Sequence, residues 1–193
     1  MNKYIVEAFG AGVLTLVVGL SLAGTFPVPT PVLAALTLGL FVYSVGHVSG
    51  VHINPAVTIG VWSIGKIGNK DAFLYLVSQF VGASLALMFM GATIVATELT
   101  IDNSSLIGLA EFIGTFLFTF GIASVIYGKV PSSLSGVVVG GSLLLGITVA
   151  VLLGSNGMLN PAVAFGTGSF GIMYVLGPVI GAVLGMQAYK RLM

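Results

Sequence analysis

The chain has 193 residues, of which 57% are hydrophobic and only 6% charged, and its formal net charge is +1. Soluble domains carry about 25% charged residues. Six basic and five acidic side chains cannot cover a water-facing surface of this size, which excludes a soluble globular domain. The 28 glycines follow no Gly-X-Y period, which excludes collagen and suits closely packed transmembrane helices. The absence of cysteine excludes disulfides and thiolate metal sites.

Apolar stretches of transmembrane length recur along the chain. A transmembrane helix needs about 20 mostly apolar residues, with a range of roughly 17–25. Two shorter apolar pieces, 55–63 and 161–169, each begin at a proline and are too short to cross a bilayer. We predict six spans, at 3–23, 32–49, 72–96, 106–127, 134–153 and 172–189.

The first apolar stretch also has features of a secretory signal peptide. Lys3 precedes it, and Ser21-Leu22-Ala23 would serve as a cleavage site. Two observations favour a retained span instead. Glu7 interrupts the apolar run, and a later stretch repeats the same pattern.

The distribution of charge predicts an orientation. Basic residues favour cytoplasmic loops. If the N-terminus is cytoplasmic, all six basic residues fall on the cytoplasmic side, whereas Glu98 and Asp102 fall on the other side. We therefore predict that both termini are cytoplasmic. The basic residues are Lys3, Lys66, Lys70, Lys129, Lys190 and Arg191.

The two halves of the chain repeat each other. In YIVEAFGAGVLTLVVG and GLAEFIGTFLFTFGIA, Glu7 matches Glu111 and Gly10 matches Gly114. Nearly the same spacing separates HINPAVTIG (52–60) from MLNPAVAFG (158–166). Each half has an odd number of spans, so the halves are inverted, and such repeats place their sites near the bilayer midplane. We predict one channel domain over 1–193, with a first repeat of about 1–98 and a second of about 104–193.

The two Asn-Pro-Ala triplets open the two short apolar pieces. Asn is a preferred N-cap residue, and Pro is favoured at the first helical position. Asn54-Pro55-Ala56 and Asn160-Pro161-Ala162 therefore predict the starts of two half-length helices whose N-termini meet at the midplane. Each N-terminus carries about half a positive charge and repels cations.

Irregular backbone inside a membrane must line a cavity or be satisfied by protein. The Asn amides can donate to a passing water, and the carbonyls ahead of each helix can accept. The residues thus predict a pore that conducts neutral hydrogen-bonding molecules and opposes cations, a combination that is general for half-helix pores. The expected acceptor carbonyls are those of Gly50, Val51, His52, Asn156, Gly157 and Met158.

Four ionisable residues lie near these loops. Intramembrane carboxylates usually have a partner, so we expect Glu7 and Glu111 to brace the loops rather than contact solute. His47 is expected to brace the first loop as well, although a histidine could also give a pH response. His52 could face the pore or hold the loop. Two separated histidines predict no metal site. No nucleophile–base pair or phosphate-binding loop is present, so no enzyme, cofactor or nucleic-acid partner is predicted.

The whole chain resembles the major intrinsic protein family, the aquaporins and glycerol facilitators. GHVSGVHINPAVTIG (46–60) is similar to the family's first-loop signature, and AEF (110–112) and GPVIGA (177–182) are similar to its fourth and sixth helices. The resemblance implies an all-α membrane protein with six transmembrane helices and two re-entrant half-helices in an inverted 3+3 repeat. It also implies a homotetramer with one pore per subunit.

One position departs from the family pattern. Most members have Arg after the second triplet, where it narrows the outer mouth, and this chain has Val163. By the family pattern, counted without gaps, the other constriction positions are Ala34, Thr148 and Gly157. The resemblance therefore implies a channel for neutral solutes that is not restricted to water.

The expected function is passive conduction of water, with glycerol, ammonia and hydrogen peroxide as further candidate solutes, in a prokaryotic inner membrane. Two alternatives stay open. One is a non-conducting membrane scaffold on the same fold, and the other is a small-solute or ion channel with little water selectivity.

Overall fold

The computed structural model describes residues 1–24, 26–93 and 101–193, and every regular element within them is helical. The helix that begins at Ser105 is capped by Ser104, whose side chain accepts from the backbone N–H of Ile107. The elements are α1 (Asn2–Ala23), α2 (Thr30–Ser49), α3 (Pro55–Ser63), α4 (Asn69–Thr93), α5 (Ser105–Ile126), η1 (Ser132–Leu134), α6 (Ser135–Leu152), α7 (Pro161–Gly166) and α8 (Met173–Leu192).

The long helices match the six predicted spans. Within the described residues, five segments are long and apolar enough to cross a membrane: α1, α2, α4, α5 and η1 with α6. Helix α8 is also 20 residues long, but Pro178 lies within it and Lys190 and Arg191 occupy its last turn. The end of the third predicted span (94–96) and Glu98 lie outside the described residues.

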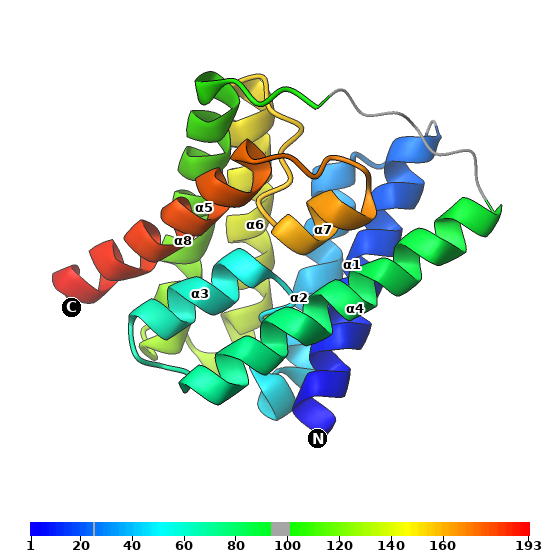
Figure 1. Cartoon of the computed structure of the whole chain (residues 1–193). Helices are drawn as coiled ribbons and strands as arrows, with labels where there is room; N and C mark the ends of the chain where they lie inside the picture. Colours follow the sequence, from blue (N-terminus) through cyan, green and yellow to red (C-terminus); the bar gives the residue numbers. More distant parts are fainter. Residues whose placement is uncertain (25, 94–100) are drawn as a thin grey trace.

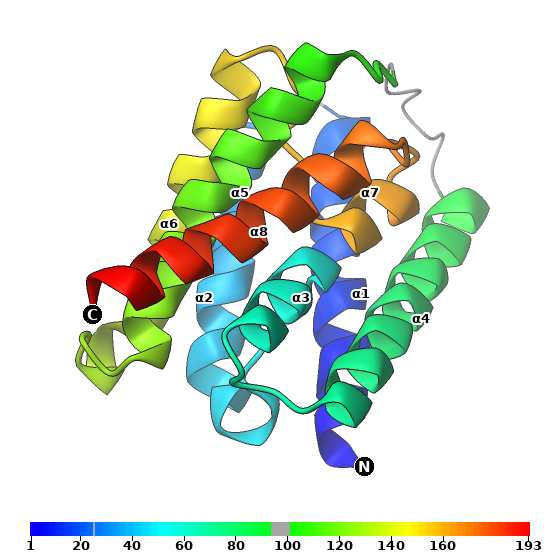
Figure 2. The same ribbon diagram turned by 60° about the vertical axis from the view of Figure 1, so that its left-hand side comes forward.

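The two short pieces are helices, as predicted, but the second is shorter than expected. Helix α3 has nine residues, and α7 has only six. Helix α7 stops at Gly166 because Gly168 adopts a left-handed φ of 79° and the chain turns there. In both views the two short helices lie between the long helices α4 and α8 (Figure 1 and Figure 2).

Glycines allow the long helices to touch backbone to backbone. A Cβ on Gly82 would lie 1.9 Å from the carbonyl oxygen of Ala8, where α4 crosses α1. The equivalent crossing of α8 and α5 would place a Cβ on Gly181 2.4 Å from the oxygen of Phe112. Small residues at such crossings are how membrane helices approach closely without a hydrophobic driving force.

The outer surface is apolar. Large side chains such as Phe9, Phe73 and Leu106 are more than half exposed on it, whereas Glu7 and Glu111 are fully buried inside. This inside-out distribution of polarity fits lipid as the solvent. The chain is an integral membrane protein.

Candidate functional site

Each Asn-Pro-Ala triplet starts a short helix, as the sequence predicts. The Asn54 side-chain oxygen accepts from the backbone N–H groups of Ala56 (2.8 Å) and Val57 (3.4 Å). Asn160 caps α7 in the same way, accepting from Ala162 (3.0 Å) and Val163 (3.3 Å). Both asparagines are extended, and a proline follows each at the first helical position. The helix starts are therefore set by residues that favour them intrinsically.

The two asparagines also join the two loops to each other. Asn54 Nδ2 donates to the carbonyl of Leu159 (2.9 Å), and Asn160 Nδ2 donates to the carbonyl of Ile53 (3.0 Å). This reciprocal pair places the two helix N-termini side by side at the centre of the molecule. One amide hydrogen of each asparagine is thereby used, which the sequence analysis did not foresee. Each Nδ2 carries a second hydrogen, and both residues line a cavity.

Glu7 holds the first loop from α1. Its carboxylate accepts from the backbone N–H groups of His52 (2.9 Å) and Ile53 (2.6 Å). It also accepts from the Ser49 hydroxyl (2.7 Å) and from Gln79 Nε2 (2.8 Å). Four donors converge on two oxygens, so both oxygens act as acceptors and a buried carboxylate is fully satisfied.

Glu111 holds the second loop from α5 in the corresponding way. It accepts from the backbone N–H groups of Met158 (2.9 Å) and Leu159 (2.7 Å). The hydroxyl of Ser155 donates to it as well. Ser155 also accepts from the Gly157 N–H (3.1 Å), as Ser49 accepts from the Val51 N–H (3.0 Å) in the first loop.

These contacts orient the loop carbonyls. Three successive N–H groups in each loop point toward the glutamate side, and no described peptide bond is cis. In a trans peptide the C=O points opposite to the N–H of the next residue. The carbonyls attached to these six amides therefore point away from the glutamates, and their residues line the two cavities described below. They belong to Gly50, Val51, His52, Asn156, Gly157 and Met158.

The loop backbone is strained where it is held. Val51 (φ 51°), Ile53 (φ 41°) and Leu159 (φ 49°) are left-handed although none is a glycine. Such conformations cost of order 1–3 kcal/mol each and persist only where their surroundings impose them. The second loop has Gly157 (φ 66°) in the place that corresponds to Val51. The carboxylate bonds to the neighbouring amides supply the constraint.

Two cavities meet at the loops. The first, of about 330 Å³, we call the Val163 cavity. The second, of about 370 Å³, we call the Lys66 cavity. His52 lines both and so lies where they adjoin, with its Nδ1 3.1 Å from the Thr58 hydroxyl. The Val163 cavity is lined by Ala34, Leu38, Ile147, Gly157, Asn160 and Val163, among others. The Lys66 cavity is lined by Ser49, Gly50, Val51, Lys66, Tyr75 and Val139, among others.

The structure corrects one constriction residue. Ala34, Gly157 and Val163 line the Val163 cavity, but Thr148 is exposed on the other face of α6 and donates to the carbonyl of Leu144. Ile147 faces the cavity instead. A Cβ on Gly157 would lie 3.1 Å from its Cγ2. Counting without gaps misplaced the position by one residue, which on a helix rotates the side chain by about 100°.

The structure also corrects His47. It is exposed on α2, and its side chain makes no hydrogen bond to the described part of the chain, so it does not brace the loop. Ser49 and Gln79 contact Glu7 instead. The sequence held a signal for the serine, because Ser49 and Ser155 each stand five residues before the asparagine of their triplet.

Charge is sparse along the two cavities. Lys66 is the one lysine or arginine among the described residues that line them, and its ammonium lies 4.9 Å from the centre of the Tyr127 ring. Within the described residues no three His, Cys, Asp or Glu side chains gather as a metal site would require.

Comparisons with known proteins agree with this geometry. The chain matches the Major intrinsic protein family over residues 4–189. It belongs to that family. The family consists of passive channels for water and small solutes and not of enzymes, and this member is such a channel.

Several curated relatives are similar over most of the chain. Aquaporin AqpM of Methanothermobacter thermautotrophicus is 31% identical, covering 100% of this chain and 94% of that protein. Probable aquaporin AqpM of Archaeoglobus fulgidus is 35% identical over 82% of this chain and 73% of that protein. Aquaporin NIP1-1 of Oryza sativa subsp. japonica is 33% identical over 98% of this chain and 74% of that protein.

A solved structure shows the same fold. The X-ray structure of the aquaglyceroporin from Plasmodium falciparum superposes with a TM-score of 0.71, covering 98% of this chain and 95% of that one at 22% identity. This family member therefore has the aquaporin-like fold.

Proposed function

We propose that the protein conducts water and small neutral solutes from the Val163 cavity, past Asn54 and Asn160, into the Lys66 cavity, and that the two short helices oppose cations. The observation that carries this proposal is the reciprocal bond between each asparagine and the opposite loop. It places two helix N-termini at one point, where each contributes about half a positive charge.

The same point presents both kinds of hydrogen-bonding group. The six oriented carbonyls accept, and the second amide hydrogen of each asparagine donates. A water molecule or small solute can replace its lost hydration with these groups. A cation meets the paired positive ends of α3 and α7 in a poorly screened environment, where repulsion is strong.

Solute choice is proposed to lie in the Val163 cavity. Its constriction consists of Ala34, Ile147, Gly157 and Val163, and none of these side chains carries a hydrogen-bond donor or a charge. The arginine that most of the family places after the second triplet is replaced by Val163. We infer that glycerol, ammonia and hydrogen peroxide pass along with water.

The organisation of the channel is part of the proposal. Residues 1–98 and 104–193 form two inverted halves of one channel domain, and both termini are cytoplasmic. The channel works as a homotetramer in a prokaryotic inner membrane. The charge distribution of the loops supports the cytoplasmic termini, and the archaeal relatives support a prokaryotic membrane. The repeated motifs support the two halves, and membership of the family supports the homotetramer.

Stopped-flow light scattering on proteoliposomes tests the proposal. We expect water flux well above that of empty vesicles and measurable glycerol flux, without fast proton flux reported by an interior dye. Val163→Arg should lower glycerol flux relative to water flux. Water flux equal to that of empty vesicles would favour a non-conducting scaffold, and rapid ion flux would favour an ion channel. An unchanged flux ratio in the variant would remove Val163 from the constriction.

A further inference from the structure

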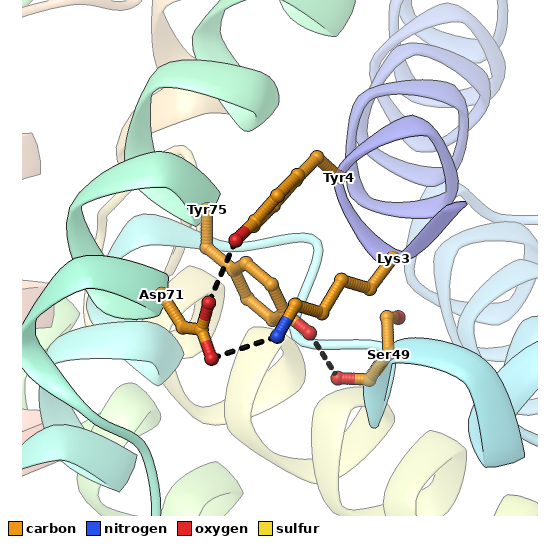
Figure 3. Close-up of polar contacts among 5 residues, drawn as sticks. All are labelled: Lys3, Tyr4, Ser49, Asp71 and Tyr75. Carbon is orange, nitrogen blue, oxygen red and sulfur yellow. Dashed lines mark hydrogen bonds and ion pairs between the residues drawn. The ribbon is translucent and has the colours of Figure 1, made fainter. Parts of the chain in front are cut away.

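A polar cluster joins the start of α1 to the start of α4. The Lys3 ammonium and the Tyr4 hydroxyl each donate to the Asp71 carboxylate, both at 2.7 Å. Figure 3 shows the two side chains reaching Asp71 from α1, with Tyr75 next to them. The rings of Tyr4 and Tyr75 meet edge to face, with their centres 6.0 Å apart.

Tyr75 connects this cluster to the loop that lines the cavity. Its hydroxyl donates to the carbonyl of Ser49 (2.7 Å), the residue whose side chain bonds to Glu7. Its ring and the His52 ring meet edge to face, with their centres 5.1 Å apart. Tyr75 is 3% exposed and is itself part of the wall of the Lys66 cavity. A continuous set of contacts thus runs from an ion pair at the surface to the point where the two cavities adjoin.

Among the described residues, the cluster has no counterpart in the second half. Helix α4 crosses α1 where Gly82 meets Ala8, and α8 crosses α5 where Gly181 meets Phe112. If these two crossings are matched, Tyr174 in the second half corresponds to Tyr75 in the first. Counted along the sequence, Phe170 corresponds to Asp71, but it precedes α8, which begins at Met173, and its ring packs against Phe80 and Phe165. The places of Lys3 and Tyr4 are taken by Ile107 and Gly108. The second half keeps the tyrosine, but no ion pair lies beside it in the part of the chain that the structure describes.

We propose that Lys3, Tyr4 and Asp71 form a latch that positions Tyr75, and that Tyr75 sets how readily water passes through the Lys66 cavity. The inference rests on the proposed function, because it concerns the rate of that conduction. Opening the latch frees the Tyr75 ring from Tyr4 and lets it turn into the cavity that it lines. The passage beside His52 then narrows, and the water permeability of each channel falls.

The ion pair is suited to a positional role. The Lys3 and Asp71 side chains are 35% and 33% exposed, and a pair this open to solvent contributes little to global stability. Its loss is therefore expected to change the position of Tyr75 more than it changes folding. Stability and conductance can be separated by experiment.

A double-mutant cycle tests the latch. We expect Asp71→Ala and Tyr75→Phe each to lower water permeability per reconstituted channel by roughly fivefold, the population change that one net hydrogen bond supports. Because both act on the same contact chain, the double variant should show no further loss. Asp71→Glu should restore most of the flux, and Lys70→Ala, next to Asp71 but outside the cluster, is the matched control.

Folding is followed separately by thermal unfolding in detergent. If Asp71→Ala reduces the folded yield, Asp71→Asn, which removes the charge but keeps an acceptor for Tyr4, must still lower permeability. Additive losses in the cycle, or an Asp71→Ala channel as permeable as Lys70→Ala, would overturn the latch while leaving the proposed function intact. Wild-type flux no faster than empty vesicles would overturn the proposed function and the latch together.

Discussion

Replacing Glu111 by glutamine isolates the role of its charge in holding the second loop. The variant keeps the size of the side chain and exchanges one acceptor oxygen for an NH2 donor. At one carboxylate oxygen the new donor would face the Ser155 hydroxyl and the Met158 N–H, and at the other it would face only the Leu159 N–H. Placing the NH2 group opposite Leu159 breaks fewer hydrogen bonds, so the Leu159 N–H is expected to lose its partner.

The structure gives the size of the effect. A buried N–H left without a partner costs about 1–3 kcal/mol, and bonds to a charged acceptor exceed neutral ones by roughly 1 kcal/mol. With one orphaned amide and two weakened bonds, Glu111→Gln should lower the free energy of unfolding by about 3–5 kcal/mol. The carbonyl of Leu159 accepts from Asn54, so the loop junction loosens as well and water flux should fall.

The assay is unfolding in mixed micelles by added SDS, followed by far-UV circular dichroism, with stopped-flow water flux on the same preparations. His47→Gln, on an exposed side chain without a partner in the described chain, is the control and should stay within about 0.5 kcal/mol of wild type. A Glu111→Gln protein as stable and as permeable as this control would refute the argument that the carboxylate holds the loop.

Three further predictions follow from the same geometry. Ile147→His should lower glycerol flux relative to water flux by roughly tenfold, because one altered side chain in a pocket can change the preference between two solutes by about that factor. Thr148→His, on the exposed face of α6, should leave the ratio unchanged. Gly82→Ala should cost about 1–3 kcal/mol of unfolding free energy because its Cβ would lie 1.9 Å from a backbone oxygen of α1. The control is Gly91→Ala, which should cost little because a Cβ on Gly91 would have no atom within 4 Å. Equal melting temperatures for the Gly82→Ala and Gly91→Ala proteins would contradict the prediction. Asn54→Ala removes a helix cap and the donor to the Leu159 carbonyl, so it should cost about 2–5 kcal/mol in the same unfolding assay, and a cost below about 1 kcal/mol would contradict both roles.

Much of this protein could be predicted from local sequence. Length and apolarity determine the spans, because a bilayer demands about 20 such residues whatever they pack against. Asn followed by Pro determines the starts of α3 and α7, because capping is a contact between neighbours in the chain. The repeated Glu7 and Glu111 pointed to braced loops, because an intramembrane carboxylate needs a partner.

The tertiary structure alone decided which side chains meet across the chain. Thr148 and Ile147 are adjacent in sequence, and only the rotation of α6 against its neighbours decides which of them faces the cavity. His47 lies near the first loop in sequence but points outward, whereas Ser49 turns toward Glu7. The bonds of Asn54 and Asn160 to opposite loops join residues more than 100 positions apart. No local pattern encodes such pairings, because they depend on how two separately formed halves come together.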